Sequence, residues 1–85
     1  MIDYEYVKKA KYLKDYKIWI EFEDGKKGEI NLSKIIRKYK GVFEPLRDIN
    51  YFKNFKISGG TIAWENEADI APETLYQAFK KQNKR

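Results

Sequence analysis

The sequence predicts a small single domain of the α+β class: an antiparallel three-stranded meander, a second hairpin, short helices and a C-terminal helix. The 85 residues are 42% apolar and 16% aromatic, enough for one core and too few for two. Alternating apolar residues in the first part of the chain predict strands, and helical spacing after Ser33 and Pro72 predicts helices. We expect residues 1–85 to form one domain, with residues 1–5 and 82–85 frayed.

The meander has the clearest pattern. Residues 6–13 predict an edge strand, because lysines interrupt the apolar positions and discourage pairing with other chains. The next strand alternates apolar and polar residues up to Asp24-Gly25, a dipeptide suited to a tight hairpin, and the buried face continues on the return strand. The residues assigned to this face are Tyr16, Ile18, Ile20, Phe22, Ile30 and Leu32.

A short helix is expected from Ser33, as the N-cap, to a stop at Gly41. At about 100° per residue, its apolar residues fall on one stripe and its basic residues on the opposite side. The basic side chains form an exposed basic ridge, which consists of Lys34, Arg37 and Lys38.

Residues 43–55 carry an apolar side chain at every third position, and this period predicts 3₁₀ turns or a broken helix rather than one regular helix. Asp48 is expected to cap a short helix within this segment. A second hairpin follows with Gly59-Gly60 at its turn, and Pro72 suits the first position of the C-terminal helix. The core-facing residues of that helix are Leu75, Ala78 and Phe79.

The composition excludes several function classes. Histidine and cysteine are absent, which removes thiolate zinc sites, thiol nucleophiles and every Ser-His or Cys-His arrangement. We therefore predict that the chain is not an enzyme, with no catalytic residue, metal site or cofactor. No stretch approaches the ~20 apolar residues of a membrane span, so the expected location is the cytoplasm, without a membrane partner.

Charge is unevenly placed along the chain, whose net charge is +5. Residues 57–79 hold 4 acidic side chains and no basic ones, whereas residues 80–85 hold 4 basic side chains and no acidic ones. This polarity allows a basic face toward nucleic acid or an acidic partner, with the acidic segment turned away.

Three stretches together resemble the bacterial family catalogued as domain of unknown function 2442. They are YKIWIEFEDGKKGEINLSKII, FEPLRDINYFKNF and ISGGTIAWENEADIAPETLY. The shared pattern is a D-G hairpin, a helix opened by Ser, L-R-D before an aromatic pair, and Trp-x-Asn followed by D-I-x-P-E-x-L-Y. The chain departs from it at Glu67, where such sequences often have glycine after Asn66. The resemblance implies a small antiparallel α+β fold and supplies no catalytic residues.

Four candidate protein-binding residues lie in one segment. Trp64 and Asn66 place an aromatic plane beside an amide, which suits contact with a base or a peptide. The favoured alternative is structural: Trp64 fills the core and Asn66 satisfies backbone groups of a turn. Glu65 and Asp69 belong to an acidic edge, for which a solvated surface or an interface with a basic protein is favoured over a divalent-cation site. The acidic edge consists of Glu65, Glu67, Asp69 and Glu73.

Trp19 is the fifth candidate for protein binding, because it points away from the buried face of its strand. Together with three tyrosines it forms a candidate aromatic patch on the outer face of the sheet. The alternative is that the C-terminal helix covers this face. The tyrosines are Tyr4, Tyr6 and Tyr12.

The basic ridge and the C-terminal lysines are candidates for nucleic-acid binding, because such side chains neutralise phosphates. No helix-turn-helix pair, OB-fold pattern or RNP motif accompanies them. The candidate residues are Lys34, Arg37, Lys38, Lys80 and Lys81.

The sequence therefore predicts a small non-enzymatic binding module that acts through protein–protein contacts. Some members of the resembling family lie beside small toxin-like genes, which implies a regulatory or antitoxin-like role toward a neighbouring small protein. The alternative function is that of a nucleic-acid-binding accessory protein. A second copy of the chain is a further candidate partner.

Overall fold

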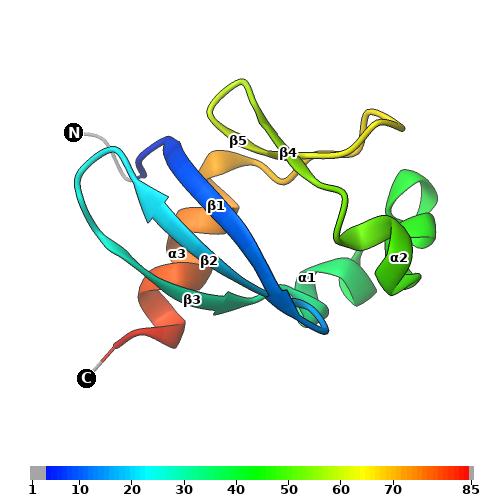
Figure 1. The fold of residues 1–85 in the computed structure, drawn as a ribbon, viewed down its shortest axis with the longest axis horizontal. Helices are drawn as coiled ribbons and strands as arrows, with labels where there is room; N and C mark the ends of the chain where they lie inside the picture. The colour runs from blue at the N-terminus through cyan, green and yellow to red at the C-terminus, as the bar shows by residue number, and fades with distance from the viewer. Residues whose placement is uncertain (1–3, 85) are drawn as a thin grey trace.

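The first three strands form the antiparallel meander that the sequence predicts (Figure 1). The computed structural model describes residues 4–84. The strands are β1 (Val7–Lys14), β2 (Lys17–Phe22) and β3 (Lys27–Asn31), in the order β1-β2-β3. The central strand β2 is therefore paired on both sides.

The register assigns alternate residues of β2 to the two faces of this sheet. Ile18 lies opposite Tyr12 and Ile30, whereas Trp19 lies opposite Lys11 and Glu29. Directly opposed residues share a face. The Ile18 side is the inner face, where the side chains are buried, and the Trp19 side is the outer face.

A second, two-stranded sheet consists of β4 (Lys56–Ser58) and β5 (Thr61–Ala63), which is the second predicted hairpin. The Val7 N–H donates to the carbonyl of Gly60 at 2.8 Å and links this hairpin to the first sheet. All residues of β5 are buried and all residues of β4 are exposed. The buried strand thus lies on the core side of the hairpin.

Three short helical elements connect the two sheets: α1 (Ser33–Lys38), the 3₁₀ helix η1 (Gly41–Arg47) and α2 (Ile49–Phe52). The predicted 3₁₀ geometry is confirmed in η1. The predicted cap of α2 is also confirmed, because the Asp48 side chain accepts a hydrogen bond from the Asn50 N–H at 2.9 Å.

Two predictions at the ends of α1 are wrong. Ser33 is the first helical residue rather than the N-cap, and its own N–H donates to the Asn31 side chain at 2.8 Å. The N-cap position is held by Leu32 without a side-chain cap hydrogen bond, and the Asn31 side chain instead bonds the backbone two residues further on, at the first N–H of the helix. Gly41 does not end α1 but opens η1, after α1 has ended at Lys38.

The C-terminal helix α3 (Pro72–Gln82) packs on the inner face of the first sheet, behind the strands in Figure 1. Its Tyr76 and Phe79 rings contact Phe22 of β2, with centroids 4.9 and 5.1 Å apart. Pro72 occupies the start of the helix as predicted. Within residues 4–84, no helix has both the length and the apolar character needed to cross a membrane.

The end of α3 docks on the outer edge of β3. The Gln82 side-chain amide accepts from the Asn31 N–H at 2.8 Å and donates to the Asn31 carbonyl at 2.9 Å, while the Asn83 amide donates to the Glu29 carbonyl at 3.0 Å. Gly28 permits this approach, because a Cβ there would lie 3.0 Å from the Asn83 Oδ1. Side-chain amides thus take the place of a fourth strand.

These hydrogen bonds involve Gln82 and Asn83, which lie in the segment 82–85 that is expected to fray. Fraying of this segment stays a prediction. The two amide side chains are held by backbone groups that the β3 edge would otherwise leave unpaired. Of the other residues expected to fray, 1–3 and 85 lie outside the described part of the chain.

Candidate functional site

Trp64 belongs to the core, which removes it from the candidate binding surface. Its side chain is 2% exposed, and its indole N–H donates to the carbonyl of Phe52 at 2.8 Å. The ring also contacts the rings of Phe52 and Phe43, with centroids 5.8 and 6.5 Å away. The structural alternative for this residue is therefore the correct one.

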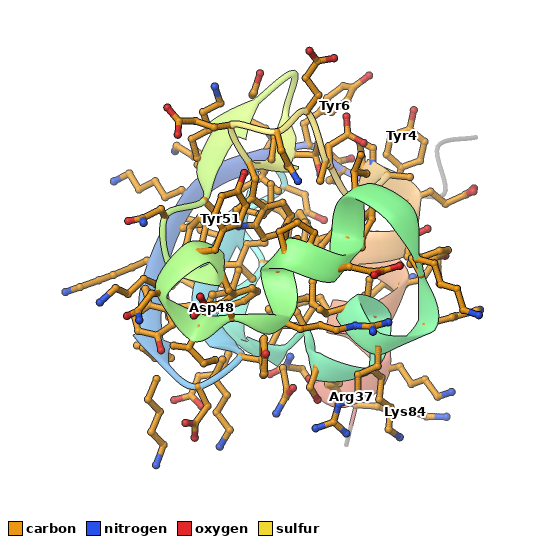
Figure 2. All side chains as sticks on the ribbon, turned by 90° about the vertical axis from the view of Figure 1, so that its right-hand side faces the viewer. Tyr4, Tyr6, Arg37, Asp48, Tyr51 and Lys84 are labelled. Carbon is orange, nitrogen blue, oxygen red and sulfur yellow. The ribbon has the colours of Figure 1, made fainter. Side chains whose placement is uncertain are left out.

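Asn66 holds a turn together. Its side-chain amide donates to the carbonyl of Val42 at 2.8 Å and accepts from the N–H of Ala68 at 3.1 Å, while its own N–H donates to the Tyr51 hydroxyl at 3.1 Å. Tyr51 is labelled in Figure 2. Because these bonds use both ends of the amide, Asn66 connects η1 and α2 to the turn after β5 and has a structural role.

Trp19 lies half-buried on the outer face of the first sheet, directly between Lys11 and Glu29. The C-terminal helix does not cover it, because α3 packs on the opposite face against Phe22 (Figure 1). In that view no helix of the described chain lies over the outer face. This candidate protein-binding residue is therefore accessible from outside.

The tyrosines expected beside Trp19 lie elsewhere. Tyr12 is opposite Ile18 on the inner face, and its ring packs 6.3 Å from that of Phe52. An irregularity of the register after Val7 shifts the alternation of β1, which the sequence pattern did not reveal. Tyr4 and Tyr6 contact each other edge to face at 5.8 Å and lie together in Figure 2.

The outer face around Trp19 is rich in lysine. The register places on it five lysines and two glutamates, and within residues 4–84 none of these side chains has an ion-pair partner closer than 4 Å. The residues are Lys9, Lys11, Lys14, Lys17, Glu21, Lys27 and Glu29. We call this surface, with Trp19 at its centre, the outer sheet surface.

The acidic candidates are separate from Trp19. Glu65 and Asp69 are exposed in the segment after β5, in the yellow part of the ribbon in Figure 1. In the described chain, no three acidic side chains come together in a way that could hold a metal ion. The structure thus separates the remaining predicted protein-binding residues into one tryptophan on a sheet and two carboxylates in the segment between β5 and α3.

Several basic candidates meet at one open cleft of about 970 Å³ along α3. Lys38, Lys80 and Lys81 line it together with Lys84 and with Lys26, which the sequence analysis missed. Lys26 belongs to the β2–β3 hairpin, and only the packing of α3 brings it here. Glu73 also lines the cleft, so the acidic segment is not wholly turned away from the basic one.

The other two residues of the basic ridge do not line this cleft. Lys34 and Arg37 are exposed on α1, and Arg37 extends from the lower side of the molecule in Figure 2. The Arg37 carbonyl accepts a hydrogen bond from the Arg47 guanidinium at 3.4 Å. The ridge is therefore divided, because only Lys38 of its three residues lines the cleft.

A family model described as "Protein of unknown function (DUF2442)" matches residues 7–81. The chain belongs to the DUF2442 family. No curated protein and no solved structure matches it. The match confirms the resemblance carried by the three sequence stretches.

At the position where this DUF2442 chain departs from the family pattern, the backbone keeps a conformation that suits glycine. Glu67 has a φ of 72°, in the left-handed region, and its N–H donates to the Trp64 carbonyl at 3.0 Å. The tight turn thus forms without glycine, at the cost of backbone strain.

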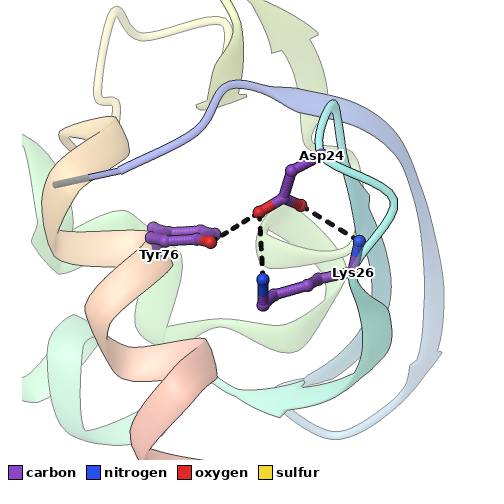
Figure 3. A network of polar contacts seen from close by, with 3 residues as sticks. All are labelled: Asp24, Lys26 and Tyr76. Atoms are coloured by element: carbon purple, nitrogen blue, oxygen red, sulfur yellow. Dashed lines mark hydrogen bonds and ion pairs between the residues drawn. The ribbon is translucent and has the colours of Figure 1, made fainter. Parts of the chain in front are cut away.

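A polar network joins the β2–β3 hairpin to α3 (Figure 3). Asp24 accepts hydrogen bonds from the Tyr76 hydroxyl at 2.6 Å and the Lys26 N–H at 3.0 Å, and the Lys26 ammonium lies 3.4 Å away. Desolvation raises the pKa of Asp24, but these hydrogen bonds and the Lys26 charge together lower it below its ordinary value. The hydrogen bond to Asp24 raises the pKa of Tyr76. The spacing of 52 residues hid this network from sequence reasoning.

Proposed function

We propose that this DUF2442 protein is a small non-enzymatic binding module of the cytoplasm, which acts through protein–protein contacts as a regulatory or antitoxin-like partner of another small protein. The observation that carries the proposal is the position of Trp19 on a sheet face that α3 leaves uncovered. The absence of histidine and cysteine supports a role without catalysis.

The chemistry of the outer sheet surface suits an acidic partner. Tryptophan is enriched among the residues that dominate binding energies, because a rigid indole buries a large area at little conformational cost. The neighbouring lysines contribute apolar stems around the indole and ammonium groups at the rim. A partner with an apolar pocket ringed by carboxylates would complement this surface in shape and charge.

Affinity capture from the native host, with and without nuclease, tests the proposal. Tagged wild-type protein should retain a stoichiometric protein that survives nuclease, and Trp19→Ala should lose it. Leu13→Ala is the matched control, because Leu13 is an apolar, 39% exposed residue of the same sheet. It is not paired with Trp19 in the sheet. If Trp19→Ala and wild type retain the same amount of the partner protein, the outer sheet surface is not the binding site.

Nucleic-acid binding is a second candidate function, favoured by the convergence of five lysines on the cleft along α3. Neutralising phosphates releases counterions, so affinity should fall steeply with salt, by about 0.9 in log-log slope for each phosphate on duplex DNA. The variant K38Q/K80Q/K81Q should then have a slope shallower by about 2 to 3. The control K8Q/K53Q/K56Q removes the same charge from exposed residues that do not line the cleft.

A further inference from the structure

A small pocket lies between η1 and the segment that enters α3. Its volume is about 250 Å³, and it is lined by Tyr39, Phe43, Asp69, Ile70, Ala71 and Thr74. Pockets for whole small molecules usually have about 300–1,000 Å³. The space therefore suits a single side chain of a partner better than a complete ligand.

Aromatic rings form one side of this pocket. The Tyr39 and Phe43 rings have centroids 5.4 Å apart and are inclined by 45°. Phe43 is backed by the buried Trp64 ring and packs against the core, whereas Tyr39 is 39% exposed. The inner ring is thus fixed by the core and the outer ring is open to a partner.

The acidic group of the pocket is Asp69, on a segment with defined backbone pairing. Asp69 bridges to Ala63 of β5, and the next residue, Ile70, donates its N–H to the Ile62 carbonyl at 3.1 Å. Ala68 and Ile70 are buried on either side, which directs Asp69 outward. The carboxylate is therefore held at the pocket by an extended segment rather than by a loose loop.

Two aromatic rings and one carboxylate favour a cation. Ring faces attract ammonium and guanidinium groups within about 6 Å of the centroid, and a carboxylate adds a charge-assisted hydrogen bond. The chain already uses one of these rings in this way, since the Lys38 ammonium lies 5.8 Å from the centroid of Tyr39. Lys38 is not a lining residue of the pocket, and residues 57–79 carry no basic side chain.

We infer that the Tyr39–Phe43–Asp69 pocket receives a lysine or arginine side chain of a partner protein. The aliphatic stem would lie on Phe43, and the cationic head would contact Tyr39 and Asp69. The inference rests on the proposed function in one respect, that the chain binds proteins, and it adds a second contact with a basic segment.

The pocket is tested directly with short peptides, without the native partner. Acetyl-Gly-Arg-Gly-amide is titrated into isotope-labelled protein, and the amide shifts of Ala71 and Thr74 are followed by NMR. The control peptide contains citrulline, which keeps the shape of arginine and removes its charge. We expect saturable shifts with arginine and at least roughly fivefold weaker binding with citrulline, because the neutral head loses both charge interactions.

Variants distinguish binding in the pocket from general attraction of the peptide to acidic side chains. Asp69→Asn should weaken the arginine peptide roughly two- to fivefold, the range of an exposed ion pair, and Phe43→Leu should also weaken it. Glu65→Gln, which removes a charge from the acidic edge outside the pocket, should leave the affinity unchanged. Equal binding of the two peptides, or equal loss in the Glu65 and Asp69 variants, would overturn the inference. Loss of captured protein in Trp19→Ala reports on the proposed function independently.

Discussion

The two tryptophans of the chain occupy opposite environments, and their neighbours explain why. Trp19 alternates with Ile18 and Ile20 along a strand that is covered on one side only, so the period of two correctly assigns it to the outer face. Trp64 follows a strand in which all residues are buried, so alternation carries no information there. The core position favoured for Trp64 rested on the size of its side chain, and the structure confirms it by the 2% exposure and the indole hydrogen bond to Phe52.

The different roles of the two indoles predict different costs of removal. Trp64→Phe leaves the buried Phe52 carbonyl without its donor and should lower the free energy of unfolding by about 1–3 kcal/mol. Trp19→Phe should change it by less than about 0.5 kcal/mol, as is usual at the surface. Urea unfolding followed by circular dichroism measures both. Similar losses in the two variants would contradict the assignment of Trp64 to the core.

The left-handed backbone at Glu67 predicts a stabilising substitution. A non-glycine residue in this region raises the free energy of the folded state by roughly 1–2 kcal/mol, and glycine removes this strain. Part of the resulting stabilisation is offset, because glycine has greater conformational freedom in the unfolded chain. Glu67→Gly should therefore raise the free energy of unfolding by about 0.5–1 kcal/mol. Glu65→Gly, where the backbone has no positive φ, should not stabilise. Thermal melts compare the two, and a lower melting temperature for Glu67→Gly would refute the explanation.

At the scale of elements, α3 is tied to the meander by polar groups at two places, one near its middle and one at its C-terminal end. One tie is the hydrogen bond from Tyr76 to Asp24 in the β2–β3 turn, and the other is the pair of amides on the β3 edge. Sequence patterns predicted the helix and the strands separately. They did not predict these ties, since each joins residues more than 50 positions apart.

The Asp24 tie predicts a dependence of stability on pH. Because folding lowers the pKa of Asp24, its contribution is present above the unfolded value of about 3.9 and is lost as pH falls through the folded value. Tyr76→Phe should lower the free energy of unfolding by about 1 kcal/mol at pH 7. It should also reduce the difference in this free energy between pH 7 and pH 3. Asp15→Asn is the control, because it removes an exposed carboxylate outside the network. An unchanged pH difference in Tyr76→Phe would count against this role.

The amide cap predicts what happens when the β3 edge is opened. Q82A/N83A removes three hydrogen bonds from the backbone of Asn31 and Glu29, and it leaves an exposed strand edge able to pair with another chain. We expect lower stability and concentration-dependent dimers, measured by light scattering coupled to size-exclusion chromatography. Lys84→Ala shortens a neighbouring exposed residue and should not alter the oligomeric state. If the variant still has the mass of a monomer at high concentration, the amide side chains are not needed to prevent pairing between two copies of the chain.

At the scale of the whole molecule, local patterns predicted most of the fold. The hairpin turn at Asp24-Gly25, the 3₁₀ segment and the helix start at Pro72 all follow from neighbours in sequence, and the structure confirms them. The register irregularity in β1 and the hydrogen bond from the Ser33 N–H to the Asn31 side chain were missed. Both features depend on which hydrogen-bond partner is nearest in space, and the periodic pattern of apolar residues in the sequence does not contain this information.

The candidate surfaces were less predictable, because each combines distant parts of the chain. Lys26 reaches the lysine cleft only when α3 packs on the hairpin, and Asp69 meets Tyr39 and Phe43 only across the core. Lys34 and Arg37 show the opposite case. They were predicted to share one side of a helix with Lys38, but only Lys38 lines the cleft. Charge patterns identified the acidic and basic segments of the chain and could not assign their side chains to faces of the molecule.

The amide cap also has a consequence for the time order of synthesis. The β3 edge leaves the ribosome 51 residues before the Gln82 side chain that closes it. At about 5–20 residues per second, that interval is roughly 3–10 s. During this interval every nascent meander presents an open strand edge, and neighbouring chains on one messenger RNA are close together. Slowed translation between residues 31 and 82 should therefore promote aggregation of this protein, although the finished chain is closed.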